Sequence, residues 1–308
     1  MSSDNITKQI DIIGFPMDLG ADRRGVDMGA SALRIAGIQD KLTRMGYSVV
    51  DLGDIQIQNQ ERQSVKETKL KYLNEIVKTS EELATKVEAT LDEGNFPLCL
   101  GGDHSIALGS IAGIAAHCKK NGKKLGVIWI DAHSDMNTEE TTPSGNIHGM
   151  PVAAALGLGS KALTHLKGFA PKVEPQNVAL LGIRSIDSRE RETIQKLGLP
   201  VYTMTDIDRQ GIHFVIDKII KDLEERVDHI HVSFDLDSVD PDVAPGVGTP
   251  VPGGLSYRET HFIMETIAEC GCMSSLEIAE TNPILDYQNR SAKFAAELVA
   301  SSMGKRIL

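Results

Sequence analysis

Short apolar runs alternate with longer stretches of helical composition along the whole chain. The apolar runs are rich in β-branched residues and have the length of buried strands. They cover residues 10–15, 47–52, 97–100, 125–130, 178–183, 201–204, 229–234 and 274–278. We therefore expect a β-strand at each of these places.

The stretches between these runs have the length and composition of helices. They cover residues 30–45, 65–91, 106–119, 189–197, 212–226, 257–269 and 291–303. Almost continuously apolar strands separated by helices are typical of a mainly parallel sheet that helices cover on both faces. Because no linker, charge run or repeat marks a boundary, we predict one α/β domain over residues 1–308.

The charge balance excludes some classes of partner. The 308 residues include 32 Lys and Arg against 43 Asp and Glu, which gives a formal net charge of −11. Proteins that bind nucleic acids or anionic membranes rely on clustered Lys and Arg, so we expect neither partner. An acidic surface instead attracts small cationic ligands.

The chain also lacks the patterns of exported and membrane proteins. No run approaches the roughly 18 to 20 apolar residues of a membrane span, and residues 1–16 lack the basic and apolar segments of an export signal. Cys99, Cys118, Cys270 and Cys272 are too few and too irregularly spaced for a disulfide framework. We therefore expect a cytoplasmic protein with reduced thiols.

Polar side chains follow four of the predicted strands directly. They lie in residues 101–104, 131–135, 235–237 and 280–283. In a parallel sheet, ligands bind beyond the carboxyl ends of the strands. We therefore expect these acids and imidazoles to converge at one edge of the sheet.

The sequence DAHSD places three potential metal ligands at alternate positions. Asp131, His133 and Asp135 can face the same way along an extended chain, and Asp235 and Asp237 can do likewise. Clustered carboxylates repel one another and lose hydration, and a bound cation offsets both costs. A polar loop or a helix cap explains any one of these motifs, whereas their recurrence at several strand ends favours a metal centre.

His104 brings the donor set to four carboxylates and two imidazoles. That number is too large for one tetrahedral zinc ion, but it suits two octahedral or five-coordinate ions bridged by carboxylates. Oxygen-rich ligation with some histidine and no cysteine favours manganese over zinc. His229 and His231 precede Asp235 on the same strand, and we expect them to be satisfied strand residues that point away from the metals.

Three of these segments resemble the metal-binding signatures of the ureohydrolase family. They are GGDHS at 101–105, DAHSD at 131–135 and SFDLDSVDP at 233–241. The resemblance extends from Gly14 to the C-terminus, and residues 137–151, 182–187 and 280–283 are more similar to the arginase branch than to agmatinases. It implies a three-layer α/β/α fold around a mainly parallel sheet of about eight strands.

The resemblance also implies a function and a cofactor. Members of this branch are binuclear manganese hydrolases that cleave the guanidinium of L-arginine to L-ornithine and urea by attack of a metal-bridging hydroxide. Two Mn²⁺ ions per subunit are then held by two ligand sets that share Asp131 and Asp235. The first set is His104, Asp131, Asp135 and Asp235, and the second is Asp131, His133, Asp235 and Asp237.

Further catalytic roles follow from the same resemblance. Asp135 helps to pass a proton to the leaving amine, His148 acts as a proton shuttle or general acid, and Glu280 holds the guanidinium. Thr249 matches a pocket threonine. Ser185 departs from the family pattern, because some arginases carry an acid at this position.

The remaining implied roles concern the amino-acid end of the substrate. Asn137, Ser144 and Asn146 match positions that bind the α-carboxylate directly or through water. Asp187, and Glu190 through water, match positions that face the α-ammonium. This pattern favours L-arginine over agmatine, which has no α-carboxylate.

The resemblance implies a homo-oligomer of bacterial type, either a trimer or a hexamer. Met150, directly after His148 and Gly149, is similar to bacterial rather than animal members. The chain also has no long C-terminal extension after the last predicted helix.

Several alternatives stay open. Another ureohydrolase would act on agmatine, guanidinobutyrate or a related guanidino acid. A metal-stabilised arginine sensor would bind without turnover, and a deacetylase-like relative would hold a single zinc ion. Asp103 and Ser105 either orient His104 or cap the following helix, and the charged loop at residues 18–27 has no assigned role.

Overall fold

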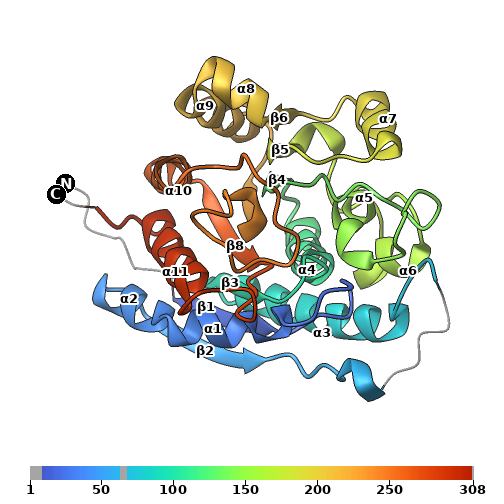
Figure 1. The fold of residues 1–308 in the computed structure, drawn as a ribbon, viewed down its shortest axis with the longest axis horizontal. Helices are drawn as coiled ribbons and strands as arrows, with labels where there is room; N and C mark the ends of the chain where they lie inside the picture. Colours follow the sequence, from blue (N-terminus) through green and yellow to red (C-terminus); the bar gives the residue numbers. More distant parts are fainter. Residues whose placement is uncertain (1–8, 63–67, 307–308) are drawn as a thin grey trace.

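An eight-stranded parallel sheet forms the centre of the molecule (Figure 1). The computed structural model describes residues 9–62 and 68–306. In sheet order the strands are β2, β1, β3, β8, β7, β4, β5 and β6. Their bounds are β1 Ile10–Phe15, β2 Val49–Asp54, β3 Phe96–Gly101, β4 Leu125–Ile130, β5 Val178–Ile183, β6 Val201–Thr203, β7 His229–Asp235 and β8 Met273–Ala279. The predicted sheet of about eight strands is confirmed.

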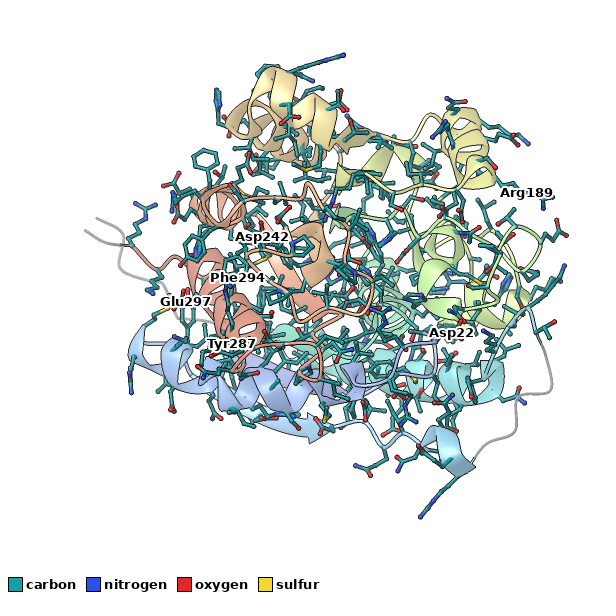
Figure 2. The ribbon with its side chains drawn as sticks, in the orientation of Figure 1. Asp22, Arg189, Asp242, Tyr287, Phe294 and Glu297 are labelled. Atoms are coloured by element: carbon teal, nitrogen blue, oxygen red, sulfur yellow. A yellow bond between two sulfur atoms is a disulfide. The ribbon has the colours of Figure 1, made fainter. Side chains whose placement is uncertain are left out.

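Helices cover both faces of the sheet, and their side chains fill the space between the layers (Figure 2). One apolar core joins the sheet to α1 (Gly29–Ile35), α2 (Ile38–Arg44), α8 (Met204–Gln210), α9 (Ile212–Glu224), α10 (Tyr257–Cys270) and α11 (Arg290–Ser302). The other joins it to α3 (Leu73–Asp92), α4 (Ile106–Lys120), α5 (Pro151–Ala155), α6 (Lys161–Thr164) and α7 (Ser188–Leu197). The three-layer α/β/α architecture is therefore confirmed. Among the helices described, none is long and apolar enough to span a bilayer.

Two of the predicted helices have different bounds in the structure. The helix expected at residues 30–45 is two helices, because the chain turns at Gly37, whose φ of 79° lies in the left-handed region. The helix expected at residues 65–91 begins only at Leu73, after turns at residues 68–72, while residues 65–67 lie outside the described part. Propensity alone does not reveal such breaks, since the flanking residues on both sides favour helix.

The expectation that all four thiols are reduced is wrong for one pair. Cys270 and Cys272 form a disulfide at the end of α10. Gly271, with a φ of 65°, turns the chain there and brings the two cysteines together. Cys99 and Cys118 are free and buried, as expected.

The strand order brings together the four polar segments found in the sequence. β3, β8, β7 and β4 are consecutive neighbours in the sheet, although they are far apart along the chain. Because all pairs are parallel, their carboxyl ends meet at the same edge. The functional residues therefore lie at the centre of this edge.

The loop that carries His104 is clamped against the loop that follows β1. The backbone N–H of Gly102 donates to Phe15, and that of Asp103 donates to Met17. A Cβ atom on Gly102 would lie 1.9 Å from the carbonyl oxygen of Met17. Only glycine permits this close approach of two backbones.

Asp103 ties a third segment to this clamp. It is fully buried, and its carboxylate accepts a hydrogen bond from the backbone of Gly20 at 2.7 Å and others from the backbone and hydroxyl of Ser105. The bonds to Ser105 lie in the turn before α4, and the N-cap residue of this helix, Ser105, makes no side-chain cap hydrogen bond. Burial raises the pKa of this carboxyl to about 7.

We predict that Gly102→Ala destabilises the metal-free protein by at least about 2 kcal/mol, because the new methyl group forces the two loops apart. Thermal unfolding followed by circular dichroism measures the loss. Gly149→Ala is the matched control, since a Cβ atom there meets no atom within 4 Å. Equal melting temperatures for the two variants would contradict the clamp.

Candidate metal centre and pocket

His104 lies at the floor of the site, with its two ring nitrogens in different surroundings. Nδ1 is 3.0 Å from Asp131, 2.9 Å from Asp235 and 3.3 Å from Asp135. Nε2 lies 2.8 Å from the hydroxyl of Ser233. Trp129 stacks on the imidazole with ring centroids 4.0 Å apart. The ring is therefore held with Nδ1 directed at the carboxylates.

The end of β4 supplies the next ligands. Asp131 is fully buried and accepts hydrogen bonds from the indole N–H of Trp129 at 2.9 Å and the backbone N–H of His133 at 2.6 Å. The Nδ1 atom of His133 lies 3.1 Å from Asp237 and 3.5 Å from Asp131. Its side chain is 29% exposed, so this part of the site faces the cavity.

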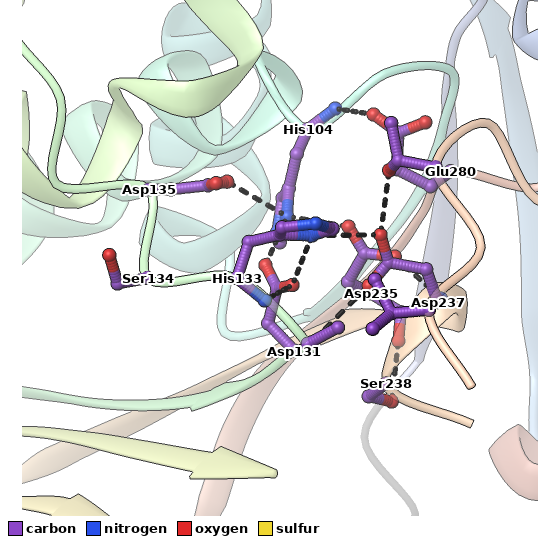
Figure 3. Close-up of polar contacts among 12 residues, drawn as sticks. His104, Asp131, His133, Ser134, Asp135, Asp235, Asp237, Ser238 and Glu280 are labelled. Atoms are coloured by element: carbon purple, nitrogen blue, oxygen red, sulfur yellow. Dashed lines mark hydrogen bonds and ion pairs between the residues drawn. The ribbon is translucent and has the colours of Figure 1, made fainter. Parts of the chain in front are cut away.

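A short 3-10 turn after β7 positions the remaining two carboxylates. Asp235 accepts the backbone N–H of Asp237 at 2.7 Å, and the hydroxyl of Ser238 donates to the backbone carbonyl of Asp235. Asp237 accepts the hydroxyl of Thr249 at 2.8 Å. Each carboxylate thus keeps oxygens directed at the imidazoles (Figure 3).

The structure groups these side chains in two sets that share one aspartate. His104, Asp131 and Asp235 form one set, and Asp131, His133 and Asp237 form the other, with the ligand atoms of each set within 4.8 Å of one another. Asp135 approaches the first set through its 3.3 Å contact with His104. The Nδ1 atom of His104 has no hydrogen-bond partner. Nitrogen and oxygen donors without sulfur fit divalent manganese, and the two sets fit two ions.

Burial and mutual repulsion make this cluster hold protons when no cation balances it. Burial raises the pKa of Asp135 and of Asp235 well above the usual carboxyl range, and neighbouring aspartates raise both further. Burial acts to lower the pKa of His104, but Asp131 and Asp235 raise it well above its usual value. A divalent cation replaces these protons, so its binding competes with acid.

Glu280 and His148 form a second polar pair beside the cluster. Glu280 follows β8, is 1% exposed and accepts the backbone N–H of His104 at 3.0 Å. The same oxygen lies 3.1 Å from Nδ1 of His148. Although burial acts to lower it, the hydrogen bond and charge of Glu280 raise the pKa of His148 to about 9. Oε2 of Glu280 is buried without a hydrogen-bond partner.

Two of the predicted catalytic residues have left-handed backbone conformations. The φ angle is 50° at Asp135 and 59° at Glu280. Such conformations cost free energy in residues with a Cβ atom, and they gather at functional sites where the surroundings enforce them.

A cavity of about 150 Å³ opens above the cluster. It brings together His133, Asp135, Asn137, Ser144, Asn146, His148, Asp187, Glu190, Asp235, Asp237 and Thr249, all of which the sequence predicted for the site. Glu280, His104 and Asp131 are buried around the cluster.

Glu190 has a structural task in addition to lining the cavity. Its carboxylate accepts hydrogen bonds from the hydroxyl of Ser134 at 2.7 Å, the backbone of Met136 at 2.9 Å and the backbone of Asp187 at 2.9 Å. It therefore ties the loop after β4 to the start of α7.

The sequence reasoning missed several residues that support the site. Trp129 and Ser233 contact metal-ligand candidates, and Lys71 donates to Asn146 at 2.9 Å and to Asp22 at 2.7 Å. Trp129 and Ser233 each lie two residues before an aspartate ligand, on the neighbouring strands β4 and β7, which is a usable signal. Lys71 carries none, because its partners lie far away in the sequence.

Comparisons with known proteins agree with this geometry. The model of the arginase family matches residues 8–304. The chain is 52% identical to an arginase of Bacillus subtilis over 98% of this chain and 99% of that protein. The native structure of Bacillus caldovelox arginase superimposes with a TM-score of 0.94, at 50% identity, over 98% of this chain and 100% of that one. An Entamoeba histolytica arginase in complex with L-ornithine gives 0.88 at 34% identity, over 97% and 99%.

We predict that Mn²⁺ stabilises the metal-free protein by about 2.7 kcal/mol for each bound ion, at a concentration one hundred times the dissociation constant of that ion. The gain is larger at pH 8 than at pH 6, because protons compete for the raised-pKa carboxyls. Thermal unfolding with and without EDTA measures it.

Asp131→Ala removes the side chain common to both sets and abolishes the gain. The control variant Asp242→Asn, in the exposed turn shortly after Asp237, retains the gain in stability. A gain that persists in Asp131→Ala would rule out this cluster as the place where the ion binds.

Proposed function

The chain belongs to the arginase family, and from this membership we propose that it hydrolyses the guanidinium group of L-arginine to L-ornithine and urea. The observation that carries the proposal is the pair of His and Asp sets sharing Asp131 at the floor of a polar cavity. The similarity of the chain to Bacillus arginases, at about 50% identity over nearly its whole length, supports the same activity.

We assign two Mn²⁺ ions to the cluster. The first takes His104, Asp131, Asp135 and Asp235, and the second takes Asp131, His133, Asp235 and Asp237. Bound there, the ions supply Lewis acidity, which makes a water nucleophilic at neutral pH and so compensates for the poor electrophilicity of a guanidinium carbon.

Glu280 has one oxygen available for the guanidinium. Oε1 accepts the bonds from His104 and His148, whereas Oε2 is buried and has no partner. Gly248 leaves room beside this oxygen, because a Cβ atom there would lie 2.5 Å from it. A guanidinium offers five N–H donors in a plane, so it can satisfy the free oxygen and balance the charge of Glu280.

His148 is placed to move protons between the cavity and solvent. Its side chain is 19% exposed and lines the cavity. With a pKa raised to about 9 it carries a proton at neutral pH, which it can give to the amine that leaves as ornithine. Asp135 lines the same cavity and, in this proposal, helps to pass the proton to the leaving amine.

The rim of the cavity is set up to donate hydrogen bonds. The Oδ1 atom of Asn146 accepts from Lys71 and its NH₂ group bonds to Asp22, which leaves one N–H of that group for a ligand. The Oγ atom of Ser144 accepts from the backbone of Asn146, and its own proton has no acceptor among the described residues. The Oδ1 atom of Asn137 accepts from Thr141, and its NH₂ group donates to Asp187. These free donors suit an α-carboxylate.

Asp187 supplies the complementary charge for an α-ammonium at the same rim. Glu190, which holds the backbone of Asp187, contributes through water in this proposal. Thr249 acts by orienting Asp237, to which it donates.

We further propose that the chain is a single ureohydrolase domain and works in the cytoplasm as a homo-oligomer of bacterial type, a trimer or a hexamer. The full-length match to bacterial arginases supports this organisation.

The test is urea release by the Mn²⁺-reloaded protein from L-arginine, agmatine and guanidinobutyrate, with bound metal counted on the same sample. We expect urea from L-arginine, and a kcat/KM for agmatine at least about 100-fold lower, because agmatine leaves the rim donors unpaired. Preferred turnover of agmatine would overturn the roles of Asn137, Ser144 and Asn146. Bound metal and arginine without any urea would indicate a sensor.

Asp187→Ala sharpens this test. It raises the KM for L-arginine about tenfold or more, since a charged hydrogen bond to the substrate is lost. Bound Mn²⁺ stays the same. Glu192→Ala, an exposed acid on the same helix, is the matched control. An unchanged KM in Asp187→Ala would exclude it from amino-group recognition.

A further inference from the structure

A line of buried polar side chains runs beneath the metal ligands, between the two central strands. Ser233 and His231 on β7 are register neighbours of Glu277 and Ser275 on β8. Glu277 is 0% exposed and His231 is 1% exposed. An ionisable side chain in the apolar core of a sheet is costly unless it has partners, so these residues need an explanation.

Glu277 is saturated with partners. One oxygen accepts the hydroxyl of Ser233 at 2.6 Å, and the other accepts the hydroxyl of Ser110, on α4, at 2.5 Å. Nε2 of His231 lies 3.4 Å from the first oxygen, and its Nδ1 lies 3.0 Å from the hydroxyl of Ser275. Although burial acts to raise it, the pKa of Glu277 is lowered, chiefly by His231. Glu277 is therefore a buried carboxylate anion.

The proton positions along this line follow from the donors available. Ser233 has a single hydroxyl proton, and the carboxylate of Glu277 can only accept it. The oxygen of Ser233 must then accept from His104, whose Nε2 lies 2.8 Å away. The ring of His104 therefore keeps its proton on Nε2, and Nδ1 can offer a lone pair to a metal ion.

We propose that Glu277 and His231 are positioning residues of the metal centre, which act on His104 through Ser233. Glu277 fixes Ser233 as an acceptor, and His231 keeps Glu277 anionic. This inference rests on the proposed two-metal site. It predicts an asymmetric effect, because the line of hydrogen bonds from Glu277 through Ser233, here called the relay, ends on His104. Among the described residues, the ion-pair contacts of His133 are with Asp131 and Asp237.

The test is a Mn²⁺ titration of the metal-free protein, with free Mn²⁺ followed by electron paramagnetic resonance. We expect Glu277→Gln to weaken the binding of the Mn²⁺ ion held by His104 about 10- to 100-fold. The affinity for the other ion stays within about twofold of the wild-type value. His231→Gln weakens the same ion by a smaller factor. Thermal unfolding of each metal-free variant reports any general loss of stability.

Two serine variants separate the relay from simple packing. Ser233→Ala breaks the line with the loss of one oxygen atom, and we expect it to weaken the same ion as Glu277→Gln. The double variant with Ser233→Ala and Glu277→Gln binds this ion no more weakly than the single variant with the lower affinity, because both substitutions act through one path. Ser110→Ala is the matched control, since it removes a donor from the oxygen of Glu277 that lies off the path to His104.

The outcomes distinguish this inference from the function on which it rests. Wild-type protein that binds fewer than two Mn²⁺ ions would contradict the proposed site itself. Two ions in the wild type, with wild-type affinities in both Ser233→Ala and Glu277→Gln, would overturn the relay alone. Equal weakening of both ions, in step with a lower melting temperature, would also overturn it, because that pattern indicates a general structural role.

Discussion

The crowding of four carboxylates at the buried ends of central strands is the constraint on which this structure depends. Asp131, Asp135, Asp235 and Asp237 lie within reach of two imidazoles and are almost fully buried. Their repulsion and lost hydration are tolerated only if protons or cations balance them. The order of the sheet, with β3, β8, β7 and β4 as neighbours, creates that crowding. The loop clamp at Gly102 and the hydrogen bonds of Glu190 hold the loops around the cluster in place despite the repulsion among the carboxylates.

The polarity of the cavity changes from floor to rim, and this gradient matches one kind of molecule. The floor is anionic, and the Oε2 atom of Glu280 is buried beside it with no hydrogen-bond partner among the described residues. The rim offers the hydroxyl of Ser144 and the remaining amide N–H of Asn146, and the acid Asp187 lines the same cavity. A molecule with a cation at one end and both charges of an amino acid at the other fits this arrangement. In the proposed function, the same distribution of charge favours L-arginine over guanidino compounds that lack an amino-acid end.

Much of this arrangement is predictable from the sequence, and the remainder depends on contacts that the sequence pattern does not show. The apolar runs place β1, β4 and β5 correctly because buried strands have a local signature. DAHSD and its companion motifs identify every metal-ligand candidate of the two His and Asp sets. Part of what pattern reasoning missed depends on contacts between distant segments. Lys71 reaches Asn146, and Glu277 reaches Ser110 on another layer. The bond between Cys270 and Cys272 depends on the turn at Gly271 rather than on a recognised spacing.

The most direct measurement of the central claim is anomalous X-ray diffraction from Mn²⁺-soaked crystals, with data collected just above the manganese absorption edge. The account predicts two peaks in the cluster, one in contact with Nδ1 of His104 and the other with Nδ1 of His133, with Asp131 touching both. A single peak, or peaks away from these residues, would contradict a two-metal hydrolase.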